Sequence, residues 1–408
     1  MRNDEHPDGR TGSAVRAEPA EATGPAEATD PAGTLAATYD VALLDLDGVV
    51  YKGQDAVPGA VDGLAAARRA GMRLAFVTNN ASRTPSATAA QLTRLGVAAG
   101  AGDVVTSAQA AAHLIADKVP PGSPVLVAGG MGLRVALRAR GLRPVSVAAE
   151  HPVAVAQGYV PGIDYGLLAE AAIAVRDGAW YVATNADKTL PTPRGPQPGN
   201  GSLLQVVIAA TGVKPVVAGK PEPPLHAEAV QRTGARRPLV VGDRLDTDIE
   251  GAVRGGADSL LVLTGVTTPL DAVLAPSGRR PTYLAADLSG LTEPQPVIGP
   301  RGSPRVGGNR APESGEDGRS AGALAAASAV GGGAAPGASQ HRAIEEHGCG
   351  GWTARRPADG GPLELSGAGA PIDGLRALCA VAWSGDQVTE DLVRPALTRL
   401  TGGDGWVR

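Results

Sequence analysis

The sequence predicts an α/β fold in which a parallel sheet carries helices on both of its faces. Between Tyr39 and Leu291, short apolar runs typical of strands alternate with stretches that have the apolar spacing of helices. This alternation is the pattern of strands joined by helical crossovers. Several of the runs also end in polar or charged residues, and ligand sites in open parallel sheets lie beyond the carboxyl ends of the strands.

The predicted elements follow one another in a regular order. In the first part of the region, strands are predicted at 41–47, 73–80 and 103–107, with helices at 61–71 and 87–96. In the last part, strands are predicted at 237–243 and 259–265, with a helix at 249–256. Short apolar runs of this kind are typical of strands that are buried on both faces.

Between these two parts lies a segment, 119–214, that is too long to be a connecting loop. It has strand and helix signals of its own, for example at 123–130, 132–141 and 180–187. We therefore predict one core domain, formed by 38–118 and 215–291, with a separate α/β domain inserted at 119–214.

The two ends of the chain differ from this region in composition. Residues 1–37 are rich in Ala, Pro, Glu and Gly and predict a disordered tail. Residues 292–345 have the Gly, Pro, Ala and Ser content of a linker. The remaining 346–408 predict a C-terminal extension with a small helical segment.

Charge and cysteine content exclude several classes of protein. The net charge of −4 and the pI near 5.9 argue against a nucleic-acid polymer as partner. Two cysteines are too few for a disulfide framework, and no apolar stretch approaches the roughly 20 residues of a membrane span. We expect a cytoplasmic protein without a membrane partner.

Two carboxylates follow the first apolar run directly. Asp45 and Asp47 are two residues apart and therefore project toward the same side of an extended segment, while Gly48 permits a sharp turn. A carboxylate buried without a partner loses hydration, so a positive group is expected beside the pair. A single Asp here would commonly cap a turn, but a pair favours a functional site.

Three later segments carry residues that suit the same site. They are Thr78, Asn79 and Asn80 at the end of the second strand, Lys220 after another apolar run, and Asp243, Asp246 and Asp248 at and after a further strand. Each segment alone has a simpler explanation: a loop cap, a solvated lysine or an acidic helix start. The four segments together favour one ligand site.

In this order, the segments DLDGVVYKG, VTNNASRT, GKP and GDRLDTDI resemble the four motifs of the haloacid dehalogenase superfamily. The wording is similar to subfamily IIA, the p-nitrophenyl phosphatase and nucleotide or sugar phosphatase branch. The resemblance covers Tyr39 to Leu291. It implies a Rossmann-like core with an inserted cap of type C2, and a phosphoric monoester hydrolase that uses Mg²⁺ and an aspartyl-phosphate intermediate.

The resemblance also implies a role for each motif residue. Asp45 would be the nucleophile, Asp47 the general acid and base, and Lys220 the cation that neutralises Asp45 and the phosphoryl oxygens. Mg²⁺ would be held by Asp45, the backbone carbonyl of Asp47 and Asp243. The remaining candidates would grip the phosphoryl group, namely Thr78, Asn79 and Asn80, or support Lys220 or the metal-bound waters, namely Asp248.

The resemblance to a family with a cap of this size implies small phosphorylated metabolites as substrates, and it also suggests a homodimer formed through the cap. Asn185 and Asp187 are candidates for substrate contact, although Asn and Asp in a Gly/Pro-rich turn as readily make local backbone bonds.

Two other functions stay open: a non-catalytic metabolite-binding or regulatory protein, and another chemistry of the superfamily such as phosphonate hydrolysis.

Two further sequence features are not interpreted as ligand sites. Gly129 to Gly132 predict a tight strand-to-helix turn rather than a dinucleotide site, and His341, His347 and Cys349 are predicted to be solvated tail residues.

Overall fold

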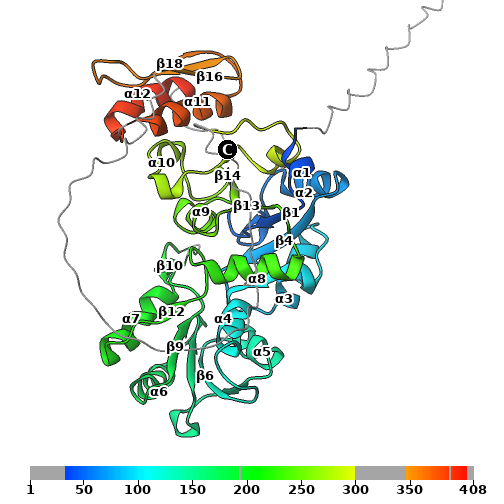
Figure 1. The fold of residues 1–408 in the computed structure, drawn as a ribbon, viewed down its shortest axis with the longest axis vertical. Coiled ribbons are helices and arrows are strands. Elements are labelled where there is room, and N and C mark those ends of the chain that lie inside the picture. The colour runs from blue at the N-terminus through cyan, green and yellow to red at the C-terminus, as the bar shows by residue number, and fades with distance from the viewer. Residues whose placement is uncertain (1–32, 191, 193, 299–345, 386, 402–408) are drawn as a thin grey trace, which may run out of the picture. The chain divides into compact units, whose positions relative to one another are not determined.

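The computed structural model describes residues 33–190, 192, 194–298, 346–385 and 387–401. The described residues contain a six-stranded, a five-stranded and a three-stranded sheet, with two short two-stranded ribbons (Figure 1). The six-stranded sheet and its helices form the core domain, the five-stranded sheet belongs to the cap, and the three-stranded sheet lies in the C-terminal module, residues 346–401.

The core sheet is entirely parallel, with the strand order β15-β14-β13-β1-β4-β5. Its strands are β1 (Val41–Leu44), β4 (Arg73–Thr78), β5 (Val104–Thr106), β13 (Pro238–Gly242), β14 (Asp258–Val262) and β15 (Tyr283–Ala285). In the register, Leu44 lies between Phe76 and Val241, so that β1, β4 and β13 end at the same edge of the sheet. This places the residues after those three strands close together.

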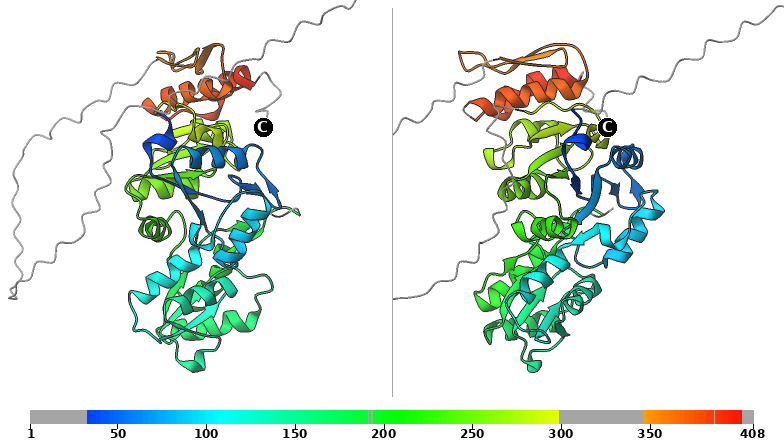
Figure 2. Two further views of the ribbon diagram at one scale, coloured as in Figure 1. Left: turned by 90° about the vertical axis from the view of Figure 1, so that its right-hand side faces the viewer. Right: turned by 45° about the vertical axis from the view of Figure 1, so that its right-hand side comes forward.

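Helices cover both faces of the core sheet (Figure 2). The core helices are α1 (Leu35–Thr38), α2 (Ala60–Arg69), α3 (Pro85–Arg94), α4 (Ser107–Ala116), α8 (Pro223–Thr233), α9 (Glu250–Gly255) and α10 (Pro269–Val273). Alternate residues of β1 belong to different apolar clusters: Leu44 packs in the cluster that contains α2 and α3, and Leu43 in the cluster that contains α4 and α8. This alternation is what a strand buried on both faces requires.

Short single turns and one ribbon complete the core. The turns are Ala101–Asp103, Leu245–Ile249, Ser277–Arg279 and Leu288–Leu291, and the ribbon pairs β2 (Tyr51–Lys52) with β3 (Asp55–Ala56).

The inserted segment forms a second parallel sheet with the order β12-β9-β8-β6-β7. Strand β12 lies just beyond the predicted end of the insertion at 214, because Val216 and Val217 pair with β9 of this sheet. Its strands are β6 (Pro124–Ala128), β7 (Arg143–Val145), β8 (Ala154–Gln157), β9 (Trp180–Ala183) and β12 (Val216–Val217). Its helices are α5 (Met131–Ala139), α6 (Tyr165–Arg176) and α7 (Asn200–Thr211), its small ribbon is β10 (Thr189–Leu190) with β11 (Gln197–Pro198), and a single turn covers Ala148–Glu150. Gly130 caps α5, which confirms the predicted strand-to-helix turn.

Helix α4 joins the core to the cap. Residues of α4, including Ala111 and Ile115, lie in one apolar cluster together with strand residues of both sheets, such as Leu43 in the core and Val127 in the cap. The same helix therefore contributes to the packing of both domains.

The C-terminal module contains the predicted helical segment, and it also contains a sheet that was not predicted. It contains β16 (Glu346–Cys349), β17 (Trp352–Arg355) and β18 (Glu364–Gly367) in an antiparallel sheet, followed by α11 (Pro371–Ser384) and α12 (Glu390–Thr401). His347 and Cys349 lie in β16 rather than in a solvated tail, whereas His341 lies outside the described residues. The strands are short and rich in Gly and polar residues, so no apolar run marked them.

This module packs on the core through an apolar cluster that also contains residues of β14, β15 and α10. Arg376 is buried and donates hydrogen bonds to the carbonyl oxygen of Leu284 at 2.9 and 2.7 Å. Arg280 donates to the carbonyl oxygen of Trp383 at 2.8 Å.

The N-terminal boundary also differs from the prediction. The tail was expected to extend to residue 37, but α1 begins at Leu35, which is buried, and Thr34 caps it by accepting a bond from the backbone NH of Ala37 at 3.2 Å. The rest of that tail, 1–32, and most of the predicted linker, 299–345, lie outside the described residues.

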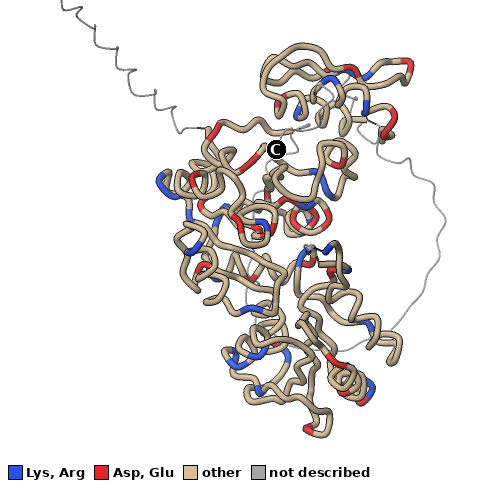
Figure 3. The backbone as a smooth tube through the Cα atoms, turned by 180° about the vertical axis from the view of Figure 1, so that it is seen from behind, with Lys and Arg blue, Asp and Glu red and all other residues tan. Residues whose placement is uncertain are grey.

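Among the helices that the structure describes, none combines the length and the apolar character needed to cross a bilayer. In the view of Figure 3, basic positions are interspersed with acidic ones along the described elements.

Candidate active site

The first strand delivers Asp45 to the edge of the sheet. The backbone NH of Asp45 still bonds the carbonyl oxygen of Val241 at 2.8 Å, so this residue is fixed by the sheet itself. The chain then turns at Gly48, which has a positive φ of 86°. A Cβ atom there would stand 2.5 Å from Oδ2 of Asp243, so the turn needs glycine for conformation and for space.

Lys220 links two acids at the centre of the site. Its Nζ lies 2.5 Å from Oδ1 of Asp45 and 2.6 Å from Oδ1 of Asp248, and it also donates to the carbonyl oxygen of Val77 at 3.3 Å. Burial alone would lower the pKa of Lys220, but the charges of Asp248 and Asp45 raise it above its ordinary value. The lysine is therefore a fixed cation.

Asp248 reaches this position because the chain makes a tight turn after β13. Its Oδ2 accepts a hydrogen bond from the backbone NH of Arg244 at 3.2 Å, which closes the turn. A Cβ atom on Gly242 would stand 2.2 Å from the Cβ atom of Asp248, so only glycine leaves room for this approach.

Asp243 is fully buried, and only one of its two carboxylate oxygens has a hydrogen-bond partner among the described residues. Its Oδ2 accepts a hydrogen bond from the backbone NH of Val266 at 2.7 Å, whereas Oδ1 has no hydrogen-bond partner among the described residues. Burial, with a further contribution from Asp248, raises the pKa of Asp243 to about 7. A buried carboxylate oxygen without a partner is costly unless a cation binds there.

The acids fit a divalent cation. Carboxylate oxygens of Asp45, Asp243 and Asp248 all lie within 4.8 Å of one another. Burial raises the pKa of Asp45 as well, and Lys220 opposes that rise, so the ionised form of the group depends on neighbouring positive charge. Oxygen ligands, a net negative charge and the orphaned Oδ1 of Asp243 match the preferences of Mg²⁺.

The raised pKa of Asp243 predicts how metal binding depends on pH. Because the ligand must be deprotonated, the affinity for Mg²⁺ is expected to weaken by about tenfold per pH unit below about pH 7. In the metal-free protein, the stabilising effect of the bound proton is fully present below the ordinary pKa of 3.8 and is lost as pH rises through about 7.

Calorimetric titration with Mg²⁺ between pH 5.5 and pH 8, together with denaturant unfolding of the metal-free protein over the same range, checks both statements. A Mg²⁺ affinity that does not change with pH would contradict the protonation of this site.

Asp47 has a different environment from Asp45. Its side chain reaches solvent, yet the surrounding protein removes enough hydration to raise its pKa, while the charges of Arg83 and Lys220 oppose the rise. A carboxyl group with a raised pKa suits proton donation near neutral pH. Arg83 was not among the predicted site residues, although it lies in the second motif.

The three residues Thr78, Asn79 and Asn80, at and after the end of β4, make different contacts. Thr78 is buried at the end of the strand. The side chain of Asn79 holds the backbone of Lys220 from both sides, because its Oδ1 accepts from the Lys220 NH at 2.8 Å and its Nδ2 donates to the Lys220 carbonyl oxygen at 3.1 Å. Asn80 is exposed, and its Oδ1 accepts two bonds from Ser82.

The two cap candidates also differ. Asn185 is buried; its Nδ2 donates to the carbonyl oxygen of Asn79 at 2.8 Å and its Oδ1 accepts from the NH of Asp187 at 3.2 Å. Asp187 accepts bonds from Nδ2 of Asn79 at 3.3 and 3.2 Å. Burial raises the pKa of Asp187, and the charge of Arg244 opposes the rise. The structure therefore brings Asp187 to the core motifs and uses Asn185 to hold the loop.

Comparison with known proteins agrees with this geometry. Residues 42–143 match the family model described as haloacid dehalogenase-like hydrolase, and residues 217–291 match a second model described as HAD-hydrolase-like. Residues 349–401 match a GCN5-related N-acetyltransferase-like domain.

Three relatives illustrate the similarity. The chain is 50% identical over 265 residues to a D-glycerol 3-phosphate phosphatase of Mycobacterium tuberculosis, covering 65% of this chain and 74% of the relative. It is 38% identical over 253 residues to an acid sugar phosphatase of Staphylococcus saprophyticus, covering 62% and 96%. A crystal structure of the glycerol phosphate phosphatase of M. tuberculosis with magnesium aligns with a TM-score of 0.73 and 38% identity, covering 90% of this chain and 99% of the other.

The chain belongs to the haloacid dehalogenase-like hydrolase family. Within it, the chain is of the subfamily IIA type, and the predicted Rossmann-like core with an inserted cap is confirmed. The prediction of a Mg²⁺-dependent phosphatase that hydrolyses small phosphate monoesters is confirmed as well.

Proposed function

We propose that Asp45 attacks the phosphorus atom of a small phosphate monoester and carries the phosphoryl group as an aspartyl-phosphate. The observation that carries this proposal is the placement of Lys220, which contacts Asp45 and Asp248 beside the orphaned oxygen of Asp243. Lys220 holds Asp45 in one orientation and supplies positive charge toward the phosphoryl oxygens. Splitting hydrolysis into two transfers makes each step easier than direct attack by water.

Asp45, Asp243 and the backbone carbonyl of Asp47 are the proposed Mg²⁺ ligands, and Asp248 supports Lys220 from within the same carboxylate cluster. When bound, Mg²⁺ supplies positive charge that offsets the repulsion between the nucleophile and the phosphate. The orphaned Oδ1 of Asp243 and the lysine that bridges Asp45 and Asp248 support this catalytic role for the cluster.

Asp47 is the proposed general acid and base. It would first protonate the leaving oxygen and then take a proton from the water that hydrolyses the intermediate. The leaving group must therefore lie on the side of Asp47. Thr78 is the proposed contact for the phosphoryl oxygens, since its hydroxyl stands at the end of β4, and Asn79 is proposed to position Lys220 rather than to bind substrate.

A groove lined by Arg83, whose charge acts on Asp47, suggests the chemistry of the leaving group. Arg83 lines a groove of about 610 Å³ together with Gln54, Gln91 and Arg94. Arg83 donates to Oε1 of Gln91, and Nε2 of Gln91 donates to the carbonyl oxygen of Gly53 at 3.3 Å. The donors left for a ligand are Gln54, Arg94 and the other NH groups of Arg83, and they favour a leaving group rich in oxygen atoms, such as a polyol. The names of the relatives, a D-glycerol 3-phosphate phosphatase and acid sugar phosphatases, support polyol phosphates as the substrate class of this chain.

Arg83→Ala is expected to lower kcat/KM for a polyol phosphate by about tenfold, because a charged hydrogen bond is worth roughly 1.5–3 kcal/mol. It should also raise the pH at which activity falls on the alkaline side, since Arg83 holds the pKa of Asp47 down. Steady-state kinetics across pH measures both effects. Arg94→Ala, in the same groove, is the control and should leave the alkaline limb in place.

The homodimer and the cytoplasmic location stay proposals. Nearly all exposed large apolar side chains of the described residues lie in the cap; they include Met131, Val147, Val153, Tyr165, Val206 and Val216. Such exposure favours a partner on the cap, and a second copy of this chain is the proposed one. Sedimentation equilibrium tests this, since a monomer at micromolar concentration would contradict it.

The proposed cytoplasmic location is supported by the cysteines. Cys349 and Cys379 are free, which suits a reducing compartment.

The experiment that tests the function is hydrolysis of a panel of phosphate esters with and without Mg²⁺. Glycerol phosphate and sugar phosphates should be hydrolysed only with the metal, and phosphonates should not be cleaved. Activity that persists in excess chelator would contradict the proposal.

A further inference from the structure

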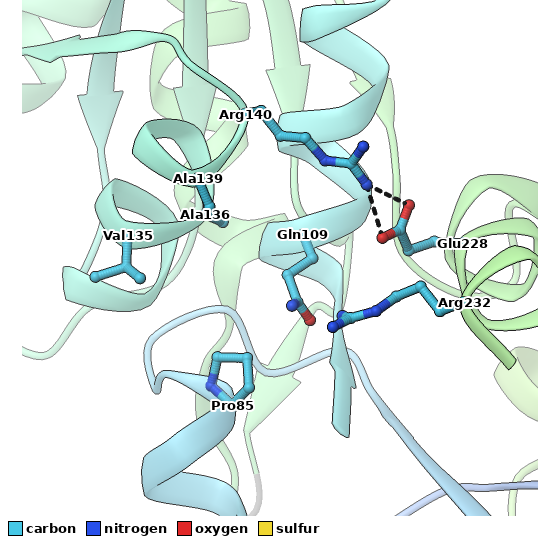
Figure 4. A pocket seen from close by; sticks show the side chains of 8 residues that line it. All are labelled: Pro85, Gln109, Val135, Ala136, Ala139, Arg140, Glu228 and Arg232. Carbon is cyan, nitrogen blue, oxygen red and sulfur yellow. Dashed lines mark hydrogen bonds and ion pairs between the residues drawn. The ribbon is translucent and has the colours of Figure 1, made fainter. Parts of the chain in front are cut away.

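A second groove lies away from the acids of the active site, between a helix of the cap and two helices of the core. Its volume is about 250 Å³, and it is lined by Arg232 and Glu228 of α8, Gln109 of α4, and Val135, Ala136 and Ala139 of α5, with Arg140 and Pro85 at its margins (Figure 4). None of these residues has a part in the proposed chemistry.

The charges in this groove are not balanced. Glu228 is buried, and it pairs with Arg140 at 2.9 and 3.0 Å and with His113. Two arginines and one glutamate line the groove, so one positive charge has no counterpart in the lining. That charge belongs to Arg232.

Arg232 is exposed to solvent and has almost no partner of its own among the described residues. Within the described part of the chain, its one hydrogen bond runs from Nη1 to the carbonyl oxygen of Val104 at 3.5 Å, and it makes no ion pair. In Figure 4 the guanidinium group of Arg232 points into the groove toward the amide of Gln109. Oε1 of Gln109 accepts from the backbone NH of Thr106 at 2.9 Å, which leaves its amide NH₂ group to donate.

The wall opposite these donors is apolar. Val135, Ala136 and Ala139 of α5 carry no polar side-chain atoms. A guanidinium and an amide donor facing an apolar wall suit a ligand that has an oxyanion at one end and a small apolar body at the other.

We propose that this groove binds a small organic anion, with its carboxylate or phosphate group on Arg232 and Gln109 and its apolar part against Ala136 and Ala139. The occupant would contact α8 of the core and α5 of the cap at the same time, and would so add to the contacts between the two domains. The site is independent of the proposed hydrolytic function.

The test uses para-fluorobenzoate as the carboxylate probe, observed by fluorine NMR with the full chain. Saturable binding is expected with the wild type and equally with Asp45→Asn, because the groove lies apart from the nucleophile. Arg232→Ala should weaken binding at least tenfold. Arg236→Ala, which removes an exposed arginine just beyond α8, should leave it unchanged.

A second variant, Gln109→Glu, tests the site independently in case Arg232→Ala does not fold. Gln109→Glu keeps an oxygen that can cap α4 but places a negative charge beside Arg232, and it should also abolish binding. Displacement of the probe by inorganic phosphate in the Asp45→Asn background would assign the site to phosphate-bearing as well as carboxylate ligands, and failure to displace would restrict it to carboxylates. Absence of saturable binding, or equal binding by Arg232→Ala and Arg236→Ala, would overturn the proposal.

Discussion

Asp45→Asn is expected to lower kcat by roughly 10⁴-fold or more, since variants that lose a nucleophile retain only the contribution of binding and of the surrounding charges. The amide is almost the same size as the carboxylate and can still accept a hydrogen bond from Lys220, so the site should keep its shape. The free energy of unfolding should not fall, because burial and the charges of Asp248 and Asp243 disfavour the charge on Asp45, and Lys220 keeps Asp248 as its partner.

Steady-state kinetics on glycerol phosphate at saturating Mg²⁺ measures this effect. Asp246→Asn is the matched control: Asp246 lies in the fourth motif and pairs with Arg244 at 2.9 Å, but its side chain is half exposed. The control should lose less than about tenfold, as expected for an exposed ion pair away from the reacting atoms. A hydrolytic rate unchanged in Asp45→Asn would rule out the nucleophile.

Lys220→Met should damage both activity and stability. The ammonium group is buried and donates to Asp45, Asp248 and the carbonyl oxygen of Val77. Methionine fills a similar volume but leaves two buried carboxylates without their cation. Removal of one partner of a buried ion pair costs about 3–5 kcal/mol of unfolding free energy, and the loss of the charge should reduce kcat by roughly 10³-fold.

Two controls separate these effects. Lys214→Met, at an exposed position before β12, should change neither quantity. The double variant Lys220→Met/Asp248→Asn should recover part of the unfolding free energy, because one of the uncompensated charges is gone, while the activity should stay low. Denaturant unfolding and steady-state kinetics distinguish the cases. A single variant as stable and active as Lys214→Met would contradict the role of Lys220.

Much of the site could be predicted from the sequence because its residues follow strands of a parallel sheet. Asp45, Thr78 and Asp243 come directly after or at the ends of β1, β4 and β13, and the sheet order makes these three strands neighbours. An apolar run that ends in such a residue predicts a buried strand and places the polar residue at its carboxyl end. The register then brings the ends together.

The roles of other site residues could not be predicted from the sequence around them. The importance of Arg83 depends on its proximity to Asp47, and the role of Asn79 depends on Lys220 lying beside it, 141 residues later in the chain. Neither pairing is visible in a motif. Asn79 was predicted to bind the phosphoryl group, whereas the structure engages its side chain with the backbone of Lys220.

In the fold, too, some elements could be predicted from a local pattern and others could not. Five buried strands of the core are short apolar runs that were predicted close to their observed bounds, whereas β15 was not predicted. The strands β16 to β18 contain Gly348, Gly367 and several polar residues, so their composition resembled the linker before them. They are held by pairing with each other and by packing on α11, which are tertiary contacts that no local pattern reports.

The central claim is that Asp45 accepts the phosphoryl group with Lys220 and the carboxylate cluster arranged around it. The most direct measurement is mass spectrometry of peptides from Asp47→Asn, acid-quenched during a single turnover of p-nitrophenyl phosphate with Mg²⁺, because p-nitrophenolate leaves without a proton from Asp47. Because this variant lacks the base that activates water, the intermediate should accumulate, and one phosphoryl group should be found on the peptide that contains Asp45. A phosphoryl group on another residue, or turnover without any covalent adduct, would contradict the account.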